Sequence, residues 1–325
     1  MIRAALPAAA LLVGLAGCAA SPPLVDGLSP GAPRSIELSA TPFFPQEEYQ
    51  CGPAALATLL RASGVVVEPQ ALTPQVFIPG RLGSLQAELI GATRRHGRLP
   101  YLLAPTADEL IAELVEGRPV LVLQNLRASR WPKWHYAVLI GYDAKRNVAL
   151  LRSGAKELLE MHWQRFAGTW HRGGRWAITT LEPGLIPMHA DAARYVEAAA
   201  GLEAAGQLRA AAASYDAAIA RWPEQEHAWL GRGNVAYAEG ELSAAADAYL
   251  RAILLEPEHA AARNNLAQVL ADSHCLAESR RQLDRAVALA QGTALAGAVE
   301  ETRANILALP PSTESCQLEG RIWPD

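Results

Sequence analysis

Hydrophobic and polar residues are patterned differently in successive parts of the chain. An apolar stretch of 12 residues, broken by Pro7 and Gly14, runs from Ala4 to Leu15. Residues 18–40 then hold Ser, Pro and Gly without periodicity, which is typical of a tether. Residues 41–185 mix helix-like runs with short apolar runs that indicate strands, whereas residues 190–295 have helical periodicity only. The pattern predicts two folded domains, followed by a tail of residues 296–325.

Two apolar runs in the first of these domains predict neighbouring strands. The run Val120–Gln124 follows a predicted helix whose start at Thr106 has Glu109 in capping-box spacing. A polar loop separates it from a second apolar run, Trp134–Asp143, which has His135 near its beginning. Short β-like runs with several tryptophans in residues 155–182 are expected to complete the sheet.

Composition narrows the class of protein. The chain has 325 residues, of which half are hydrophobic, so wholesale disorder is not expected. The net charge is −4, and the absence of a basic field argues against nucleic acid as a partner. Four cysteines are too few for a scaffold built on disulfides.

The N-terminus is typical of an export signal. Residues 1–17 combine the positive charge of Arg3 with an apolar stretch too short to span a membrane. The end of this stretch, Leu15-Ala16-Gly17 followed by Cys18, resembles the lipobox of bacterial lipoproteins. That resemblance implies lipidation of Cys18 and, with Ala19 next, an outer-membrane lipoprotein that faces the periplasm of a Gram-negative cell. An ordinary secretory signal, with Cys18 incidental, is the alternative.

The helical part of the chain repeats with a period of 34 residues. The positions that recur at this spacing include Pro223 and Pro257, and Ala218, Ala252 and Ala286. Residues 192–291 resemble three tetratricopeptide repeats, and small residues at the recurring positions let paired helices approach closely. The resemblance implies an all-α solenoid that binds a protein partner on its concave face. A structural appendage that only stabilises or spaces is the alternative.

Cys51 is the candidate nucleophile. The segment Cys51-Gly52-Pro53 precedes a helix-like run, Ala54–Ser63, which Gly64 closes. A cysteine at a helix N-terminus is expected to have a lowered pKa, because the helix dipole and free N–H groups favour the thiolate. The same N–H groups can bind a developing oxyanion. A buried structural cysteine is the alternative.

His135 is the candidate base. Cys-Gly-Pro-Ala-Ala-Leu-Ala opening a helix at Cys51, with His-Tyr-Ala-Val-Leu-Ile-Gly on a strand from His135, resembles the bacteriocin-processing double-glycine leader peptidases. The resemblance covers about residues 40–182. It implies a papain-like α+β domain, with Cys51 as nucleophile and His135 as general acid and base. It also implies a glutamine oxyanion donor: Gln46 lies five residues before Cys51, where that family usually has six, and Gln50 is a less suitable substitute.

One position departs from that family. The family has an aspartate at the end of the strand after the histidine strand, where it orients the imidazole. Ser153 occupies the corresponding position here and could orient His135 only weakly. Asp143, at the far end of the histidine strand, lies about 26 Å from His135 at ~3.3 Å per residue. The site is therefore either a Cys–His dyad or a triad whose third member is elsewhere.

The remaining cysteines and histidines indicate no further chemistry. Cys275 and Cys316 are left over and can pair in an oxidising compartment, although the sequence does not set the distance between them. No pair of histidines has the spacing of a helical zinc site, and no phosphate-binding loop occurs. We expect no metal and no cofactor.

Two functions from different classes follow from these observations. The first is an exported, lipid-anchored cysteine peptidase that cleaves a peptide or protein substrate, with the repeats recruiting substrate or partner. The second is an inert peptidase-like adaptor that acts through the repeats alone. The missing carboxylate favours the adaptor, whereas Gln46, Cys51 and His135 in compatible positions favour the enzyme.

Overall fold

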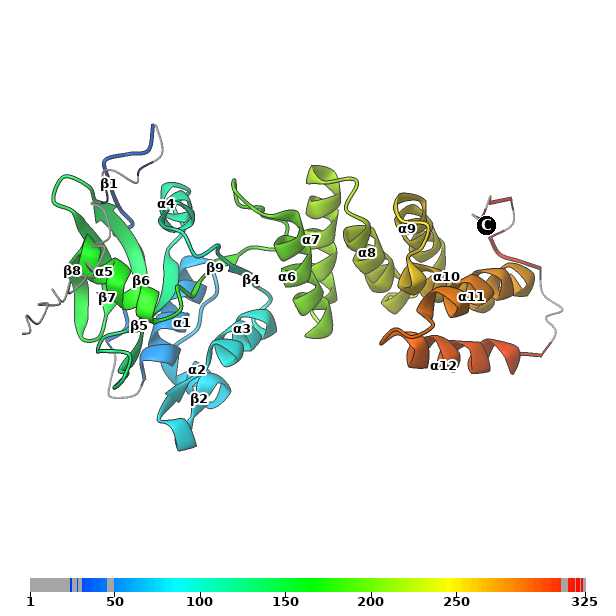
Figure 1. The fold of residues 1–325 in the computed structure, drawn as a ribbon, viewed down its shortest axis with the longest axis horizontal. Coiled ribbons are helices and arrows are strands. Elements are labelled where there is room, and N and C mark those ends of the chain that lie inside the picture. Colours follow the sequence, from blue (N-terminus) through cyan, green and yellow to red (C-terminus); the bar gives the residue numbers. More distant parts are fainter. Residues whose placement is uncertain are drawn as a thin grey trace, which may run out of the picture.

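The structure is a computed structural model. It describes residues 24, 28, 31–45, 50–310, 315–318, 320, 321 and 323. Residues 1–17, Cys18 and Gln46 lie outside the described residues. Figure 1 shows a domain built around a β-sheet, followed by a row of helices. The predicted fold class, an α+β domain followed by an all-α solenoid, is confirmed.

An antiparallel sheet forms the centre of the first domain. Its strands lie in the order β4-β9-β5-β6-β7-β8, and β1 pairs with the end of β6 that β5 leaves free. These strands are β1 (Ser35–Glu37), β4 (Leu99–Leu102), β5 (Val120–Asn125), β6 (Trp134–Asp143), β7 (Val148–Ser153), β8 (Lys156–His162) and β9 (Ala177–Leu181). A separate hairpin joins β2 (Phe77–Ile78) to β3 (Gly83–Ser84) through the short 3-10 helix η2 (Pro79–Arg81).

Helices cover both faces of the sheet. On one face are α1 (Cys51–Ala62), α2 (Pro69–Val76) and α3 (Gln86–Arg95), and on the other are α4 (Ala107–Val115) and α5 (Trp163–Arg172). Alternate side chains of β5 divide between the two cores: Leu121 packs on the α1 side and Val122 on the α4 side. Because both faces are covered, β5 is apolar at successive positions rather than at every second one.

The predicted strands at β5 and β6 are confirmed, and so is the cap at Thr106. Its side chain accepts a hydrogen bond of 3.4 Å from the backbone N–H of Glu109, at the start of α4. The expectation that residues 155–182 complete the sheet is confirmed by β8 and β9, and helix α5 lies between these two strands in the chain. Trp163, Phe166 and Trp170 recur at helical spacing and are all buried, so these three residues form the buried face of α5.

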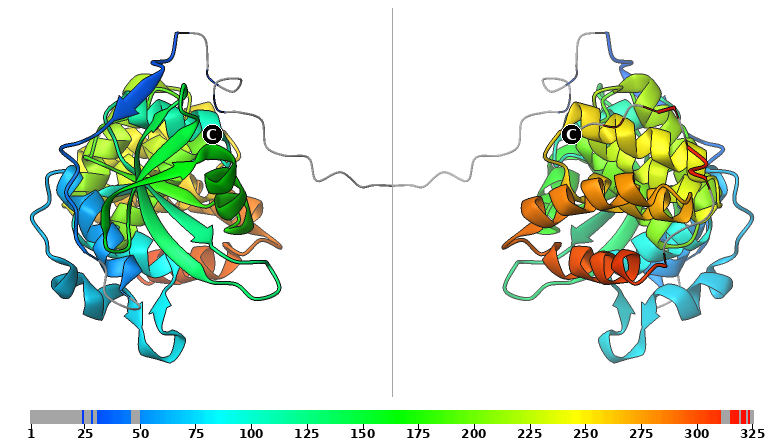
Figure 2. Two further views of the ribbon diagram at one scale, coloured as in Figure 1. Left: turned by 90° about the vertical axis from the view of Figure 1, so that its left-hand side faces the viewer. Right: turned by 90° about the vertical axis from the view of Figure 1, so that its right-hand side faces the viewer.

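Part of the predicted tether is packed on the sheet. Ile36 lies opposite Tyr142 in the β1–β6 pairing, and Leu24 is buried with its backbone N–H bonded to Asn147. Figure 2 shows β1 beside the strands of the sheet. A Cβ on Gly141 would lie 2.1 Å from the carbonyl oxygen of Ile36, so the close pairing needs a glycine here.

The second half is a row of antiparallel helix pairs. The helices are α6 (Ala192–Ala204), α7 (Leu208–Arg221), α8 (Glu226–Ala238), α9 (Leu242–Leu255), α10 (Ala260–Asp272), α11 (Leu276–Ala290) and α12 (Ala296–Leu307). Gly231 and Gly233 of α8 face the rings of Tyr215 and Tyr249, which a Cβ at either glycine would overlap. The close approach expected from small residues is therefore present. The predicted tail begins with a helix, α12, whose Val299 and Ile306 are buried in the core of the last pair.

The two halves share one hydrophobic core. Helix α6 packs against β4, and Tyr195 of α6 is buried in the same cluster as Tyr101 of β4. The Tyr101 hydroxyl accepts a hydrogen bond of 2.9 Å from the backbone N–H of Asp191, at the start of α6. Gly201 of α6 packs directly against the guanidinium of Arg94. The array is therefore fixed to the sheet domain. Among the described helices, none is both long enough and apolar enough to cross a membrane.

Candidate active site

Cys51 is the first residue of helix α1 and lies at the edge of a cavity. The helix begins at Cys51 itself, with Gln50 as its N-cap, and the side chain of Gln50 makes no capping bond. The helix start packs tightly against β3, since a Cβ on Gly52 would lie 2.2 Å from Ser84 Oγ. The Cys51 side chain is half-buried and forms no disulfide.

The environment of Cys51 corrects the expectation of a lowered pKa. Burial raises the pKa of the Cys51 thiol above its ordinary value, although backbone N–H groups of Tyr136, Gly52 and Cys51 oppose this. The N–H groups expected at the helix start are therefore present, but desolvation outweighs them. The resting cysteine is a neutral thiol.

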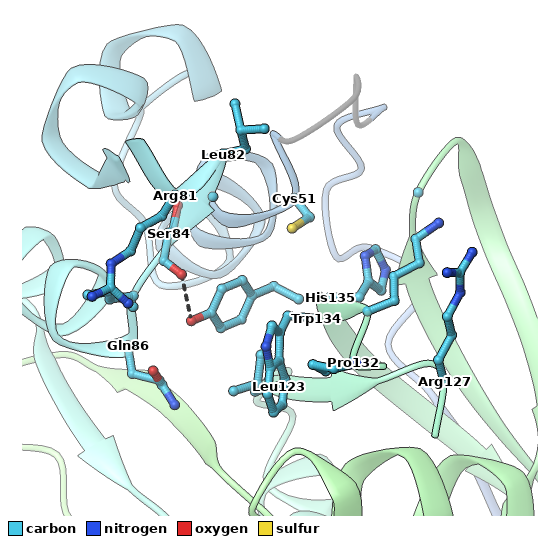
Figure 3. A pocket seen from close by; sticks show the side chains of 15 residues that line it. Cys51, Arg81, Leu82, Ser84, Gln86, Leu123, Arg127, Pro132, Trp134 and His135 are labelled. Carbon is cyan, nitrogen blue, oxygen red and sulfur yellow. Dashed lines mark hydrogen bonds between the residues drawn. The ribbon is translucent and has the colours of Figure 1, made fainter. Parts of the chain in front are cut away.

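His135 is the second residue of β6, where that strand pairs with Gln124 of β5. Burial, and secondly the charge of Lys133, lower the pKa of His135 to about 4. The imidazole is therefore neutral at pH 7. No hydrogen bond joins it to Cys51 Sγ in this structure, but both side chains line the same cavity (Figure 3).

Ser153 contacts the imidazole. Strand β7 pairs antiparallel with β6, with Arg152 opposite Val138, so the end of β7 lies beside the beginning of β6. Ser153 Oγ and His135 Nε2 are 2.8 Å apart and form a hydrogen bond. Asp143, at the other end of β6, is bonded to Arg146 instead. The hydroxyl thus occupies the place beside the ring where a carboxylate would complete a triad.

The cavity between these elements has a volume of about 890 Å³, which is within the usual range for ligand sites. One wall is the β2–β3 hairpin with the residues that follow it, and the other is the loop before β6 (Figure 3). Tyr136 connects the two walls, because its hydroxyl donates a 3.3 Å hydrogen bond to the carbonyl oxygen of Ser84.

Two residues of the site region were missed by the sequence analysis. Ser84 lines the cavity, and its Oγ is buried without a hydrogen-bond partner. The only signal in the sequence is its place just before helix α3. Arg152 is buried beside Ser153, and its guanidinium donates to the carbonyl oxygens of Ser39, Thr41 and Glu157. Arg152 thus attaches the segment around Ser39 and Thr41, which precedes Cys51 in the chain, to the sheet. The signal for Arg152 in the sequence was a single arginine in an apolar strand.

Of the predicted oxyanion donors, Gln46 lies outside the described residues, and Gln50 is not part of the cavity wall. Within the part of the chain that the structure covers, no three His, Cys, Asp or Glu side chains are placed to hold a metal ion.

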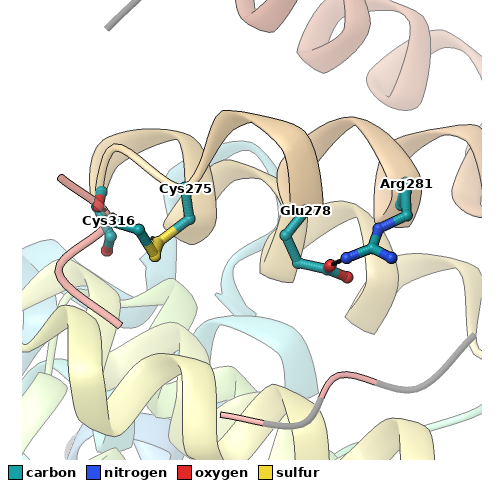
Figure 4. Close-up of a disulfide and its surroundings, with 5 residues drawn as sticks. Cys275, Glu278, Arg281 and Cys316 are labelled. Atoms are coloured by element: carbon teal, nitrogen blue, oxygen red, sulfur yellow. Dashed lines mark hydrogen bonds and ion pairs between the residues drawn. A yellow bond between two sulfur atoms is a disulfide. The ribbon is translucent and has the colours of Figure 1, made fainter. Parts of the chain in front are cut away.

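Cys275 and Cys316 form a disulfide, far along the chain from this cavity (Figure 4). Cys275 is the N-cap of α11, and the bond attaches residues 315–318 to the turn between α10 and α11. The backbone N–H of Gln317 donates to the carbonyl oxygen of Ser273, and Arg321 forms an ion pair with Asp247 of α9. The C-terminal segment is thus held against the helical array.

Comparisons with known proteins found similarity over part of the chain. Residues 39–178 match the model of the Peptidase_C39 like family. A crystal structure of a protein of Bacillus anthracis described as a C39-like peptidase has 18% sequence identity and a TM-score of 0.39, and the match covers 45% of this chain and 97% of that one. No curated protein matches the chain.

Proposed function

We propose that this chain is an exported, lipid-anchored cysteine peptidase, with Cys51 as nucleophile and His135 as general acid and base. The strongest support is that the side chains of Cys51 and His135 line one cavity, in the part of the chain that matches the Peptidase_C39 like family. The thiol is free of a disulfide, and the imidazole is held by Ser153.

The proposed reaction starts from a neutral thiol and a neutral imidazole. Cys51 Sγ bonds to the carbonyl carbon of the substrate while its proton passes to His135. His135 then gives this proton to the leaving amine as the C–N bond breaks, which leaves a thioester. Water, deprotonated by His135, attacks the thioester, and the proton returns to the sulfur as the acid product leaves.

The hydrogen bond to Ser153 supports a catalytic role for the other ring nitrogen of His135. Because Nε2 is bonded to Ser153 Oγ, Nδ1 is the nitrogen that exchanges a proton with Cys51. A hydroxyl fixes the ring without the charge of a carboxylate, so it does little to stabilise the imidazolium. Transition-state charge on the substrate oxygen is stabilised by the backbone N–H groups at the start of α1 and by the side chain of Gln46.

Export and anchoring rest on the N-terminal sequence and on the disulfide. A bond between Cys275 and Cys316 is expected to persist in an oxidising compartment. We propose lipidation at Cys18, with the folded part of the chain facing the periplasm from the outer membrane. The helical array, as tetratricopeptide repeats, would then recruit a substrate or a protein partner to a peptidase domain to which it is rigidly attached.

The test is digestion of a mixture of unstructured synthetic peptides by the chain from residue 20, with new peptide ends identified by mass spectrometry. We expect cleavage by the wild type, none by Cys51→Ala, and at least a hundredfold slower cleavage by His135→Gln. Cleavage that persists in Cys51→Ala would refute the assignment of the nucleophile.

The inert adaptor remains the second candidate, because one observation favours it: no carboxylate among the described residues contacts His135. The same experiment distinguishes the peptidase from the adaptor. An adaptor leaves every peptide intact, and its Cys51 is alkylated by iodoacetamide at the same rate in the wild type and in His135→Gln.

A further inference from the structure

The cavity beside Cys51 is lined by cations and by no described anion. Arg81 comes from the hairpin wall, and Arg127 and Lys133 come from the loop between β5 and β6. All three side chains are exposed, and none has an ion pair or side-chain hydrogen bond with another described residue. Glu47 and Glu48, which precede Cys51 in the sequence, lie outside the described residues.

The cations stand on opposite sides of the nucleophile. Figure 3 shows Arg81 and Arg127 on different walls, with Cys51 between them. An extended substrate whose scissile bond lies at Cys51 therefore lies between these two walls, with a cation on each side. Each wall offers a positive charge to substrate side chains that flank the bond.

Large apolar side chains are exposed at the same walls. Leu82, at the tip of the hairpin, is 56% exposed, and Trp134 of the opposite wall is equally exposed. Leu82 also has a φ of 47°, which is a strained conformation for a leucine and is typical of functional positions. Exposed apolar side chains beside a cavity are features of a binding surface.

We propose that this cleft selects extended peptides with acidic side chains on both sides of the scissile bond and a large apolar side chain close to it. The proposal rests on the proposed peptidase function, and it names the substrate class of the same site. Carboxylates at the flanking positions pair with Arg81 and with Arg127 or Lys133, and the apolar side chain packs between Leu82 and Trp134.

Binding to the inactive variant Cys51→Ala tests this selectivity without requiring cleavage. The probes are three fluorescent peptides of one sequence, with a central leucine flanked by Glu, by Gln or by Lys. Fluorescence anisotropy gives their Kd at low and at high salt. At low salt we expect the Glu peptide to bind about tenfold more tightly than the Gln peptide, and the Lys peptide to bind most weakly. The difference should shrink in 0.5 M salt.

Charge variants assign the selectivity to the cleft. In the triple variant Arg81→Gln, Arg127→Gln and Lys133→Gln, the Glu and Gln peptides should bind alike. Arg165→Gln, which removes an exposed cation of α5 outside the cavity, should keep the full difference. Leu82→Ser should weaken binding of all three peptides.

Equal binding of the Glu and Gln peptides to Cys51→Ala would overturn the proposal, and so would a preference that survives in the triple variant. If the Glu peptide binds selectively but the wild type cleaves nothing, the binding specificity stands and the peptidase function fails. If the wild type cleaves Glu and Gln peptides with equal kcat/KM, the function stands and the specificity fails.

Discussion

Burial of a neutral His135 should make the folded chain less stable in mild acid. The imidazole is buried beside Ser153, and burial with the charge of Lys133 lowers the pKa of His135 to about 4. An unfolded histidine has a pKa of about 6.5. The decisive comparison is between the wild type and His135→Gln, whose amide has a similar shape and does not titrate.

The sign and size of the effect follow from the two pKa values. As the pH falls below about 6.5, the unfolded chain takes up the proton and the folded chain does not, so the free energy of unfolding decreases. Above that pH the histidine is neutral in both states and has no effect. Each pH unit between the two values is worth about 1.4 kcal/mol. The wild type should therefore lose about 2 kcal/mol by pH 5 and about 3 kcal/mol by pH 4, relative to its stability at pH 7 and beyond any loss in His135→Gln.

Two measurements check this. Urea unfolding of both proteins at pH 7, 5 and 4 gives the difference in the free energy of unfolding between them. The Gln variant loses the hydrogen bond to Ser153, which adds an offset that does not change with pH. NMR titration of the imidazole C–H signals, with His135 assigned by its absence in the variant, gives the pKa directly. The low-pH limb of kcat/KM should fall near the same value, because protonation removes the base.

The reasoning is refuted if the His135 signal titrates near pH 6.5, or if the two proteins lose stability in parallel between pH 7 and 4. Either result means that the imidazole is well solvated or that a negative group lies close to it. A thiolate at Cys51 would be such a group, and the pair would then rest as an ion pair rather than in the neutral form.

Three further predictions concern single contacts. Ser153→Asp places a carboxylate beside the imidazole and should raise the pKa of His135 by about 1 to 3 pH units, as NMR titration would show; an unchanged value would mean that the side chain of residue 153 does not face the ring. Gly52→Ala should lower stability by about 1 to 3 kcal/mol, because its Cβ would lie 2.2 Å from Ser84 Oγ. Thermal unfolding of the double variant with Ser84→Gly should recover most of that loss, and additive effects would contradict the contact. Cys316→Ala opens a disulfide between residues 41 apart and should cost the array up to about 4 kcal/mol; reductant should lower the melting temperature of the wild type toward that of the variant and leave the variant unchanged.

Local signals in the sequence determined much of this protein. The Gly-Pro pair after Cys51 and the apolar run beyond it define a helix start, because capping and periodicity act within a few residues. The same holds for the strand that begins beside His135, and for helix pairs that recur every 34 residues. These features rest on neighbours in the chain, so they can be recognised without a structure.

Only the tertiary structure decided the electrostatic state of the site. The helix start favours a thiolate, but the amount of protein packed around Cys51 raises the pKa of its thiol instead. Desolvation depends on which distant segments cover a group, and spacing along the chain does not contain that information. The contact of Ser153 with His135 depends likewise on the register of β6 against β7. A slip of one residue in this register would abolish the contact.

The contact between the two halves also depends on tertiary packing alone. The pattern of hydrophobic and polar residues predicts two domains, yet Tyr101 of the sheet and Tyr195 of the first array helix are buried in one core. The apolar ring of a tyrosine can be buried against many different surfaces, so the sequence does not show which surface each of these two residues contacts. The sequence thus determined the elements and the candidate nucleophile and base. Long-range packing determined their charge states, their partners and the rigid attachment of the array, because those depend on the free energy of burying surfaces that are distant in the chain.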